Sequence, residues 1–258
     1  MVISMFELDN KVAVVTGASS GIGRDAAIAY AMAGADVCML ARREERLQEL
    51  QSKIEKLGKR ALAIPCDVTD EESIKLAVEK IIESFGKIDI LLNNAGIAVS
   101  GGLEETTVEE WDRSFAVNCR GQFLVSKYVM PHMIKQRYGK VVNMSSVNAI
   151  IGDKHDQLYR LAYNSSKAAI VGLTTGMAAA YAKYGITVNA IGPGFFKTEM
   201  TDRLIKSFVF KARYNMLTPA GRAGENGELD GTILYLSSDA SNYVQGQYIC
   251  VDGGTSIV

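Results

Sequence analysis

The chain alternates short apolar runs with longer segments in which apolar residues recur every three or four positions. The short runs predict strands at residues 11–16, 36–41, 61–65, 88–93, 140–144, 187–191 and 248–251. The longer segments predict helices at about 22–33, 47–57, 74–85, 108–136, 162–182 and 228–236. Buried strands that alternate with helices are typical of a parallel sheet covered on both faces. We therefore predict a doubly wound α/β fold of about seven strands, in one domain spanning residues 1–258.

Two segments depart from this alternation, at residues 150–161 and 197–218. Each follows the carboxyl end of a predicted strand. Ligands bind at that edge of open α/β sheets, so we expect both segments to border a ligand site.

Composition argues against several classes of function. The 258 residues are 48% hydrophobic and 22% charged, as in ordinary globular proteins. A formal net charge of −1 gives no field that would attract nucleic acid or an anionic membrane. No apolar run approaches the ~20 residues that span a bilayer, and the first residues lack a signal-peptide pattern. The four cysteines lie far apart, without a CxxC pair or a histidine cluster, so we expect free thiols, no metal site and a cytoplasmic protein.

A glycine-rich turn, TGASSGIG at residues 16–23, joins the first predicted strand to the first helix. Glycines let the backbone approach a pyrophosphate, and the helix N-terminus attracts its negative charge. A tight turn without a ligand is the alternative, because the spacing is not GxGxxG. The candidate cofactor contacts in this turn are Gly17, Ser19, Ser20, Gly21, Ile22 and Gly23.

The end of the second predicted strand bears on the choice of dinucleotide. NAD-binding folds place an acid against the ribose 2′-hydroxyl, whereas this strand ends in Ala41 and continues into Arg42 and Arg43. Alanine does not repel a 2′-phosphate, and a guanidinium offers a planar set of donors to its oxygens. Asp36 starts the strand, at the wrong end to replace the missing acid. NADP is therefore favoured over NAD, unless both arginines merely begin a solvated helix face.

Two further strand ends bring small or polar residues to the same edge. Asp67 and Val68 follow the third strand, where a carboxylate would reach an adenine amino group. The fourth strand ends in Asn93, Asn94, Ala95 and Gly96. We expect the small residues to let a dinucleotide lie flat, and the amides to tie neighbouring strands together.

Tyr163 and Lys167 are four positions apart at the start of a predicted helix, which puts them on one face. Lowering a tyrosine pKa by roughly three units requires about 4 kcal/mol. An ammonium about 4 Å away, at an effective dielectric constant near 20, supplies roughly that amount. The pair therefore predicts a general acid or base for neutral pH, although YxxxK also occurs by chance in many proteins.

Two other polar features belong to this predicted site. Ser145 and Ser146 end the fifth strand, where a hydroxyl would hold a substrate oxygen near the tyrosine. Asn118 lies inside the predicted helix at 108–136. Because asparagine is a poor helix former, a kink or a bound water is one interpretation, and a satisfied polar core residue is the other.

Together these motifs resemble those of the short-chain dehydrogenase/reductase family, over essentially the whole chain. The resemblance implies a Rossmann-type fold and an NADP-dependent oxidoreductase that acts on CH–OH groups. It also implies a catalytic tetrad of Asn118, Ser146, Tyr163 and Lys167, with Ser146 preferred because the family's serine is usually the second of such a pair. The matching motifs are TGASSGIG at 16–23, NNAG at 93–96, Asn118, Ser145-Ser146, YNSSK at 163–167 and Pro193-Gly194.

The resemblance also implies a role for each residue. In the family, the tyrosine is the general acid or base and the serine orients the substrate oxygen. The lysine lowers the tyrosine pKa and grips the nicotinamide ribose, while the asparagine holds a water. A substrate lid at about 197–218 and a homotetramer are implied as well. The implied cofactor contacts are Ile22, Asp67, Val68, Asn94, Ala95, Gly96 and residues 193–198, among them Pro193, Gly194, Phe196 and Thr198.

The chain departs from the family pattern in two places. Ser146 and Tyr163 are seventeen positions apart, more than the family usually has. The residue four beyond Tyr159 is not lysine, so Tyr163 keeps the catalytic assignment. The glycine-rich turn also lacks a basic residue often present in NADP enzymes, so phosphate recognition would rest on Arg42, with help from Ser19 or Arg43. The extra residues enlarge a loop that contains Asp153, Lys154, His155, Asp156 and Arg160.

The sequence specifies the substrate less narrowly than it specifies the type of reaction. The cationic residues in 197–218 would suit an anionic sugar acid. The aromatic residues there would suit a ring or an acyl chain. An exposed amphipathic helix is the alternative that explains both kinds of residue without a ligand. The C-terminal half is similar to gluconate 5-dehydrogenases and related polyol dehydrogenases, so a sugar acid or polyol is the first expectation. Hydroxysteroid and 3-oxoacyl substrates are the alternatives. The residues concerned are Lys206, Lys211, Arg213, Phe208, Phe210 and Tyr214.

A non-catalytic NADP-binding redox sensor is the alternative from another class, although a sensor has no need for Tyr163. Hydrolysis by a Ser/His/Asp triad is disfavoured, because the only histidines are His132 and His155 and no nucleophile-elbow motif is present. Zinc-dependent alcohol oxidation lacks its Cys/His ligand set.

Overall fold

Within residues 3–153 and 159–258, which the computed structural model describes, seven parallel strands form one sheet in the order β3-β2-β1-β4-β5-β6-β7. This confirms the predicted doubly wound α/β fold. The strands are β1 (Val12–Thr16), β2 (Asp36–Ala41), β3 (Ala61–Pro65), β4 (Ile90–Asn93), β5 (Gly139–Met144), β6 (Ile186–Pro193) and β7 (Tyr248–Val251). The helices are α1 (Gly21–Met32), α2 (Glu44–Glu55), α3 (Glu71–Phe85), α4 (Val108–Phe115), α5 (Gly121–Gln136), α6 (Leu161–Tyr181), α7 (Asp202–Ile205), α8 (Phe208–Leu217) and α9 (Asp230–Ser237).

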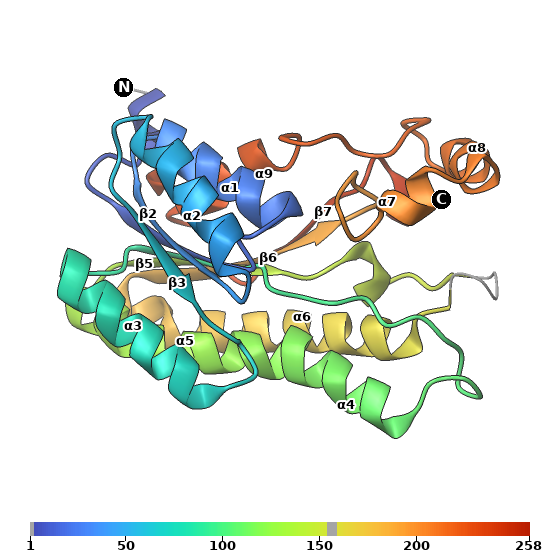
Figure 1. The fold of residues 1–258 in the computed structure, drawn as a ribbon, viewed down its shortest axis with the longest axis horizontal. Helices are drawn as coiled ribbons and strands as arrows, with labels where there is room; N and C mark the ends of the chain where they lie inside the picture. The colour runs from blue at the N-terminus through green and yellow to red at the C-terminus, as the bar shows by residue number, and fades with distance from the viewer. Residues whose placement is uncertain (1–2, 154–158) are drawn as a thin grey trace.

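Helices cover both faces of the sheet (Figure 1). Helices α1, α2 and α9 lie on one face, and α3, α5 and α6 lie on the other. Successive residues of β1 enter the two cores in turn, because strand side chains alternate between faces. Ala13 and Val15 pack in the core that contains α1, and Val12 and Val14 pack in the core that contains α3. Burial on both faces explains why β1 is apolar at four successive positions.

The order of the strands places the ligand edge. From β1 the chain builds outward to β2 and β3, then returns to the other side of β1 to form β4 and the strands beyond it. Ligands bind outside the carboxyl ends of the strands at such a reversal. The segments that follow β1, β4 and β5 therefore meet at one edge of the sheet.

The predicted helix at 108–136 is interrupted in its middle. Helix α4 ends at Phe115, α5 begins at Gly121, and a π-helical turn, η2 (Ala116–Arg120), joins them. Asn118 lies in this turn. Single π turns within helices are frequent at functional sites, and this one is the kink that was one of the two interpretations of Asn118.

The two segments outside the alternation differ in their structure. Residues 197–218 contain α7 and α8, which lie beside the C-terminus at one end of the molecule (Figure 1). Lys154, His155 and Asp156 of the enlarged loop lie outside the described residues. None of the helices in the described ranges has the length and apolarity to span a lipid bilayer.

Candidate active site

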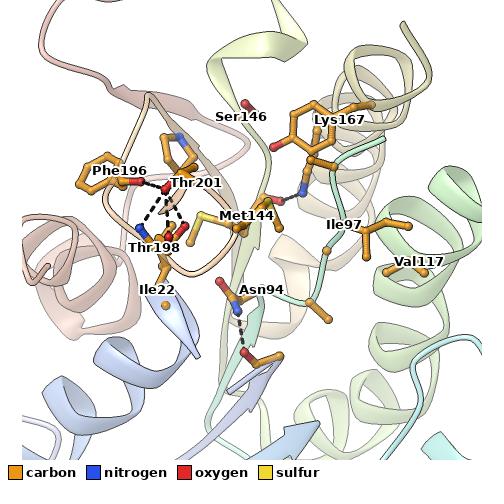
Figure 2. A pocket seen from close by; sticks show the side chains of 18 of the residues that line it. Ile22, Asn94, Ile97, Val117, Met144, Ser146, Lys167, Phe196, Thr198 and Thr201 are labelled. Atoms are coloured by element: carbon orange, nitrogen blue, oxygen red, sulfur yellow. Dashed lines mark hydrogen bonds between the residues drawn. The ribbon is translucent and has the colours of Figure 1, made fainter. Parts of the chain in front are cut away.

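A cleft of about 960 Å³ lies at the carboxyl ends of the strands. Figure 2 shows Ile22 and Asn94 at one end of it and Ser146 and Lys167 at the other. Two predicted site residues, Gly23 and Asn118, lie behind its wall. The predicted residues that line it are Gly17, Ser19, Ser20, Gly21, Ile22, Arg42, Arg43, Asp67, Val68, Asn94, Ala95, Gly96, Ser146, Tyr163, Lys167, Pro193, Gly194, Phe196 and Thr198.

The glycine-rich turn presents bare backbone to the cleft. Gly17 and Gly21 adopt φ angles of +68° and +53°, which glycine takes without steric cost. A Cβ on Gly17 would lie 2.8 Å from the Cα of Ala95. The Asn94 side chain fixes the turn from the neighbouring strand end, because its Nδ2 donates to the Thr16 carbonyl at 3.0 Å. This cradle at the N-terminus of α1 fits a pyrophosphate.

Gly23 has a packing role rather than a place in the cleft. A Cβ on Gly23 would lie 2.4 Å from Nδ2 of Asn94 and 2.6 Å from the carbonyl oxygen of Gly17. Glycine is therefore required for α1 to approach the turn and the end of β4 this closely. Gly23 does not line the cleft, and its predicted contact with the cofactor stays a prediction.

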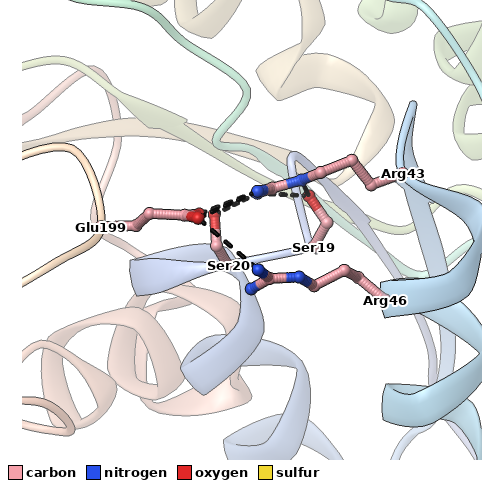
Figure 3. A network of polar contacts seen from close by, with 5 residues as sticks. All are labelled: Ser19, Ser20, Arg43, Arg46 and Glu199. Carbon is pink, nitrogen blue, oxygen red and sulfur yellow. Dashed lines mark hydrogen bonds and ion pairs between the residues drawn. The ribbon is translucent and has the colours of Figure 1, made fainter.

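Arg43 is held against the glycine-rich turn. Its guanidinium donates to the Oγ atoms of Ser19 and Ser20 and to both carboxylate oxygens of Glu199 (Figure 3). Arg42 instead interacts electrostatically with the carboxylate of Asp67. Burial would raise the pKa of Asp67, but hydrogen bonds from Thr69 and the charge of Arg42 outweigh it and lower that pKa.

Tyr163 and Lys167 both reach the cleft from one face of α6, as their spacing predicts. The Nζ of Lys167 lies 5.6 Å from the centre of the Tyr163 ring. It donates to the Met144 carbonyl at 2.9 Å (Figure 2). Burial lowers the pKa of Lys167 to about 8, with Cys119 acting weakly in the opposite direction.

The pKa of Tyr163 is raised in this structure, not lowered. Burial is the largest cause, and a hydrogen bond with Ser146 and the charge of Arg160 oppose it without outweighing it. Burial disfavours the charged forms of both the phenol and the ammonium, and the ammonium turns toward Met144. The predicted lowering of the Tyr163 pKa by Lys167 is therefore wrong for this arrangement of the two side chains.

The two serines after β5 have different partners. Ser145 is buried, and its Oγ donates to the main-chain carbonyl of Lys167 at 2.8 Å. Ser146 precedes the 3-10 turn η3 (Val147–Ala149), and its Oγ accepts from the main-chain N–H of Asn148 at 3.2 Å. It is also close enough to Tyr163 to lower the pKa of the phenol. The hydroxyl of Tyr248, on β7, donates to the Ser146 carbonyl at 2.5 Å. Both serines line the cleft, and the choice of Ser146 over Ser145 stays a prediction.

The amide of Asn118 is satisfied within the protein. Its Oδ1 accepts from the Ile97 main chain at 2.8 Å, and its Nδ2 donates to the Ile97 carbonyl at 3.0 Å and to Ser166 at 2.9 Å. Asn118 and Lys167 both lie close to Gly96, where an added Cβ would lie 3.2 Å from Oδ1 and 3.3 Å from Nζ. Asn118 therefore ties the segment after β4 to α6, which fits the interpretation as a satisfied polar residue.

Aromatic residues of the 197–218 segment, rather than its cations, face the cleft. Phe210 and Tyr214 of α8 pack against Phe195, with ring centres 4.8 and 5.3 Å away, and all three line the cleft. Phe208 is 83% exposed, and Lys206 pairs with Asp202 at the surface. The expected anion-binding role of Lys206, Lys211 and Arg213 is not supported, since none of them lines the cleft.

Two arginines that were not singled out as ligands do line the cleft. They are Arg113, on α4, and Arg160, which precedes α6. Within the described residues, neither side chain has a hydrogen bond or an ion pair. Arg160 is close enough to Tyr163 to act on its pKa. No periodicity marks these positions, because only the fold brings both elements to the cleft.

Across the described ranges, no three His, Cys, Asp or Glu side chains gather in a way that would hold a metal ion. The four cysteines are free; Cys38 and Cys66 are buried, and Cys119 and Cys250 are half-buried.

Known proteins match this chain over almost its whole length. Residues 17–256 match a family model described as enoyl-(acyl carrier protein) reductase. The chain is 41% identical to a 3-oxoacyl-[acyl-carrier-protein] reductase of Thermotoga maritima, over 97% of this chain and 99% of that one. It is 40% identical to a gluconate 5-dehydrogenase of Gluconobacter oxydans, over 98% and 97%. The crystal structure of a gluconate 5-dehydrogenase from Burkholderia cenocepacia, in complex with NADP and tartrate, is similar with a TM-score of 0.95 at 34% identity, over 100% of both chains.

Proposed function

Because this chain belongs to the short-chain dehydrogenase/reductase family, we propose that it transfers a hydride between NADP(H) and a carbonyl or secondary-alcohol substrate. One observation carries the proposal: Ser146, Tyr163 and Lys167 line the same cleft as the glycine-rich turn. Bound nicotinamide would supply or accept the hydride there. The protein would supply or accept the proton.

Tyr163 is the proposed general acid and base. Burial favours its protonated form, which is the competent form when a carbonyl is reduced. Ser146, within hydrogen-bond reach of Tyr163, would orient the substrate oxygen. Lys167 would hold the nicotinamide ribose, and Asn118 would hold α6 against the segment after β4, so that Tyr163 and Lys167 keep their places in the cleft.

NADP(H) is the proposed cofactor because Ala41 brings no carboxylate to the cleft while Arg42 and Arg43 line it. Within the described part of the chain, the Arg42 side chain has no hydrogen bond or ion pair. Its guanidinium is therefore available for a 2′-phosphate. Arg42→Ala is expected to weaken NADPH binding roughly tenfold and NADH binding little, since a charge-assisted bond is lost. Equal losses for both nucleotides would refute the 2′-phosphate assignment.

A sugar acid or polyol is the proposed substrate class. Arg113 and Arg160 line the cleft without a partner among the described residues, and a guanidinium binds a carboxylate with two parallel hydrogen bonds. Similarity to gluconate 5-dehydrogenases supports the same class. A 3-oxoacyl substrate is the second candidate, favoured by the aromatic rings of Phe195, Phe210 and Tyr214. Hydroxysteroids would use the same rings.

Steady-state oxidation of NADPH tests these substrates. The panel contains keto-sugar acids, neutral ketoses, steroid ketones and 3-oxoacyl thioesters. Arg160→Ala should raise KM for a keto-sugar acid about tenfold and leave KM for a neutral ketose unchanged. Preference for the acyl thioester with an unaffected Arg160→Ala variant would replace the sugar-acid proposal by the 3-oxoacyl one.

Tyr163→Phe separates an enzyme from a redox sensor. The variant keeps the ring and loses the proton, so it should bind NADPH as wild type does and lose at least a hundredfold in kcat. Tight NADPH binding by wild type without turnover of any substrate in the panel would favour the sensor.

The proposed assembly is a homotetramer. Trp111 of α4 and Phe123 of α5 are 38% and 49% exposed, which supports a contact between copies. Light scattering measures the mass, and a monomer at micromolar concentration would refute the assembly.

A further inference from the structure

The guanidinium of Arg43 has a partner for each of its N–H groups (Figure 3). Nε and Nη2 donate to the Ser19 hydroxyl at 3.1 and 3.0 Å, and Nη2 also donates to Ser20 at 2.7 Å. Nη1 donates to the two carboxylate oxygens of Glu199 at 2.9 and 3.1 Å. An arginine has five such donors. Arg43 therefore gains a bond to a phosphate only by giving up a partner.

The carboxylate of Glu199 occupies a position where basic side chains would otherwise bind an anion. Its carboxylate meets Arg43, and Arg46 lies 3.7 Å away. Two guanidinium groups with the Ser19 and Ser20 hydroxyls form a donor set that suits a phosphate ester. The contacts with Arg43 and Ser20 hold the pKa of Glu199 below its ordinary value, so the carboxylate is ionised at neutral pH.

We propose that Glu199 is a cofactor-selectivity residue, which occupies the donors of Arg43 in the free protein and is displaced when a nucleotide 2′-phosphate binds. The inference rests on the proposed NADP(H) function. Glu199 makes NADP(H) binding weaker than Arg42 and Arg43 would otherwise allow. A nucleotide with a free 2′-hydroxyl binds without displacing Glu199, so the residue narrows the preference for NADP(H) over NAD(H).

Adenosine 2′,5′-bisphosphate and 5′-AMP test this directly, since they differ in the 2′-phosphate and lack the nicotinamide. Their dissociation constants are measured by calorimetry on the full-length wild type, Glu199→Gln, Glu225→Gln and Arg42→Ala. Glu225→Gln is the matched control, because Glu225 pairs with Lys197 of the same segment and does not line the cleft. Circular dichroism checks that each variant is folded.

Glu199→Gln should bind the bisphosphate roughly tenfold more tightly, as expected when one negative charge is removed beside a phosphate near water. Its affinity for 5′-AMP should stay within about twofold of wild type, and Glu225→Gln should match wild type for both. Unchanged bisphosphate affinity in Glu199→Gln, together with a loss in Arg42→Ala, would overturn the role of Glu199 and leave the NADP(H) proposal standing. No effect of either substitution would overturn both.

Discussion

Lys167 is expected to make the stability of the cofactor-free protein depend on pH. Burial lowers the pKa of Lys167 to about 8, against about 10.4 for a lysine in water. Below pH 8, both the folded and the unfolded chain keep the proton, and folding bears the full cost of burying the charge. Between these two pKa values, the folded form releases a proton that the unfolded chain retains. The free energy of unfolding therefore rises with pH across this window.

The size of the effect follows from the two pKa values. Each pH unit inside the window adds about 1.4 kcal/mol to the free energy of unfolding. Wild type should therefore gain about 2 kcal/mol relative to Lys167→Met between about pH 7.5 and pH 10. Urea denaturation of both proteins across this range measures the gain, and other titrating groups cancel because the two chains share them.

Lys140→Met is the matched control. Burial also lowers the pKa of Lys140 to about 8, but its Nζ donates to Asn242 at 2.6 Å and it does not line the cleft. Lys140→Met should show a similar pH-dependent difference and keep its turnover. Lys167→Met should lose turnover and bind NADP(H) more weakly. Parallel stability curves for wild type and Lys167→Met from pH 7.5 to 10 would refute the reasoning from burial.

Two further substitutions test the supports of the site. Tyr248→Phe removes the hydroxyl that donates to the Ser146 carbonyl, and the loss of about 1 kcal/mol of positioning should lower kcat about fivefold without changing NADPH affinity. Steady-state kinetics measure this, and an unchanged kcat would contradict the positioning role of Tyr248. Gly23→Ala forces a Cβ to 2.4 Å from Asn94 and should lower the free energy of unfolding by about 2 kcal/mol. Gly172→Ala, in an open position of α6, should not destabilise the protein in the same denaturation assay, so equal losses would contradict the packing argument.

The order of apolar and polar residues along the chain was enough to place the helices, the strands and the local residue pairs. β1 had to be apolar at successive positions because it is buried on both faces, and that burial made it visible as a strand. Tyr163 and Lys167 share a face of α6 because a four-residue spacing holds in any helix, whatever it packs against. The rule that ligands bind at the carboxyl ends of strands then placed both the glycine-rich turn and this pair at one edge.

Tertiary structure alone decided the contacts between distant segments. Arg43 and Glu199 are 156 positions apart, and Ser146 and Tyr248 are 102 apart, so no local pattern marks either pair. The direction of the Tyr163 pKa shift was also hidden, because it depends on how deeply the phenol is buried and on the neighbours it meets. Spacing along the chain specifies which side chains share an element, while strand order and packing specify which elements face each other and how much water remains between them.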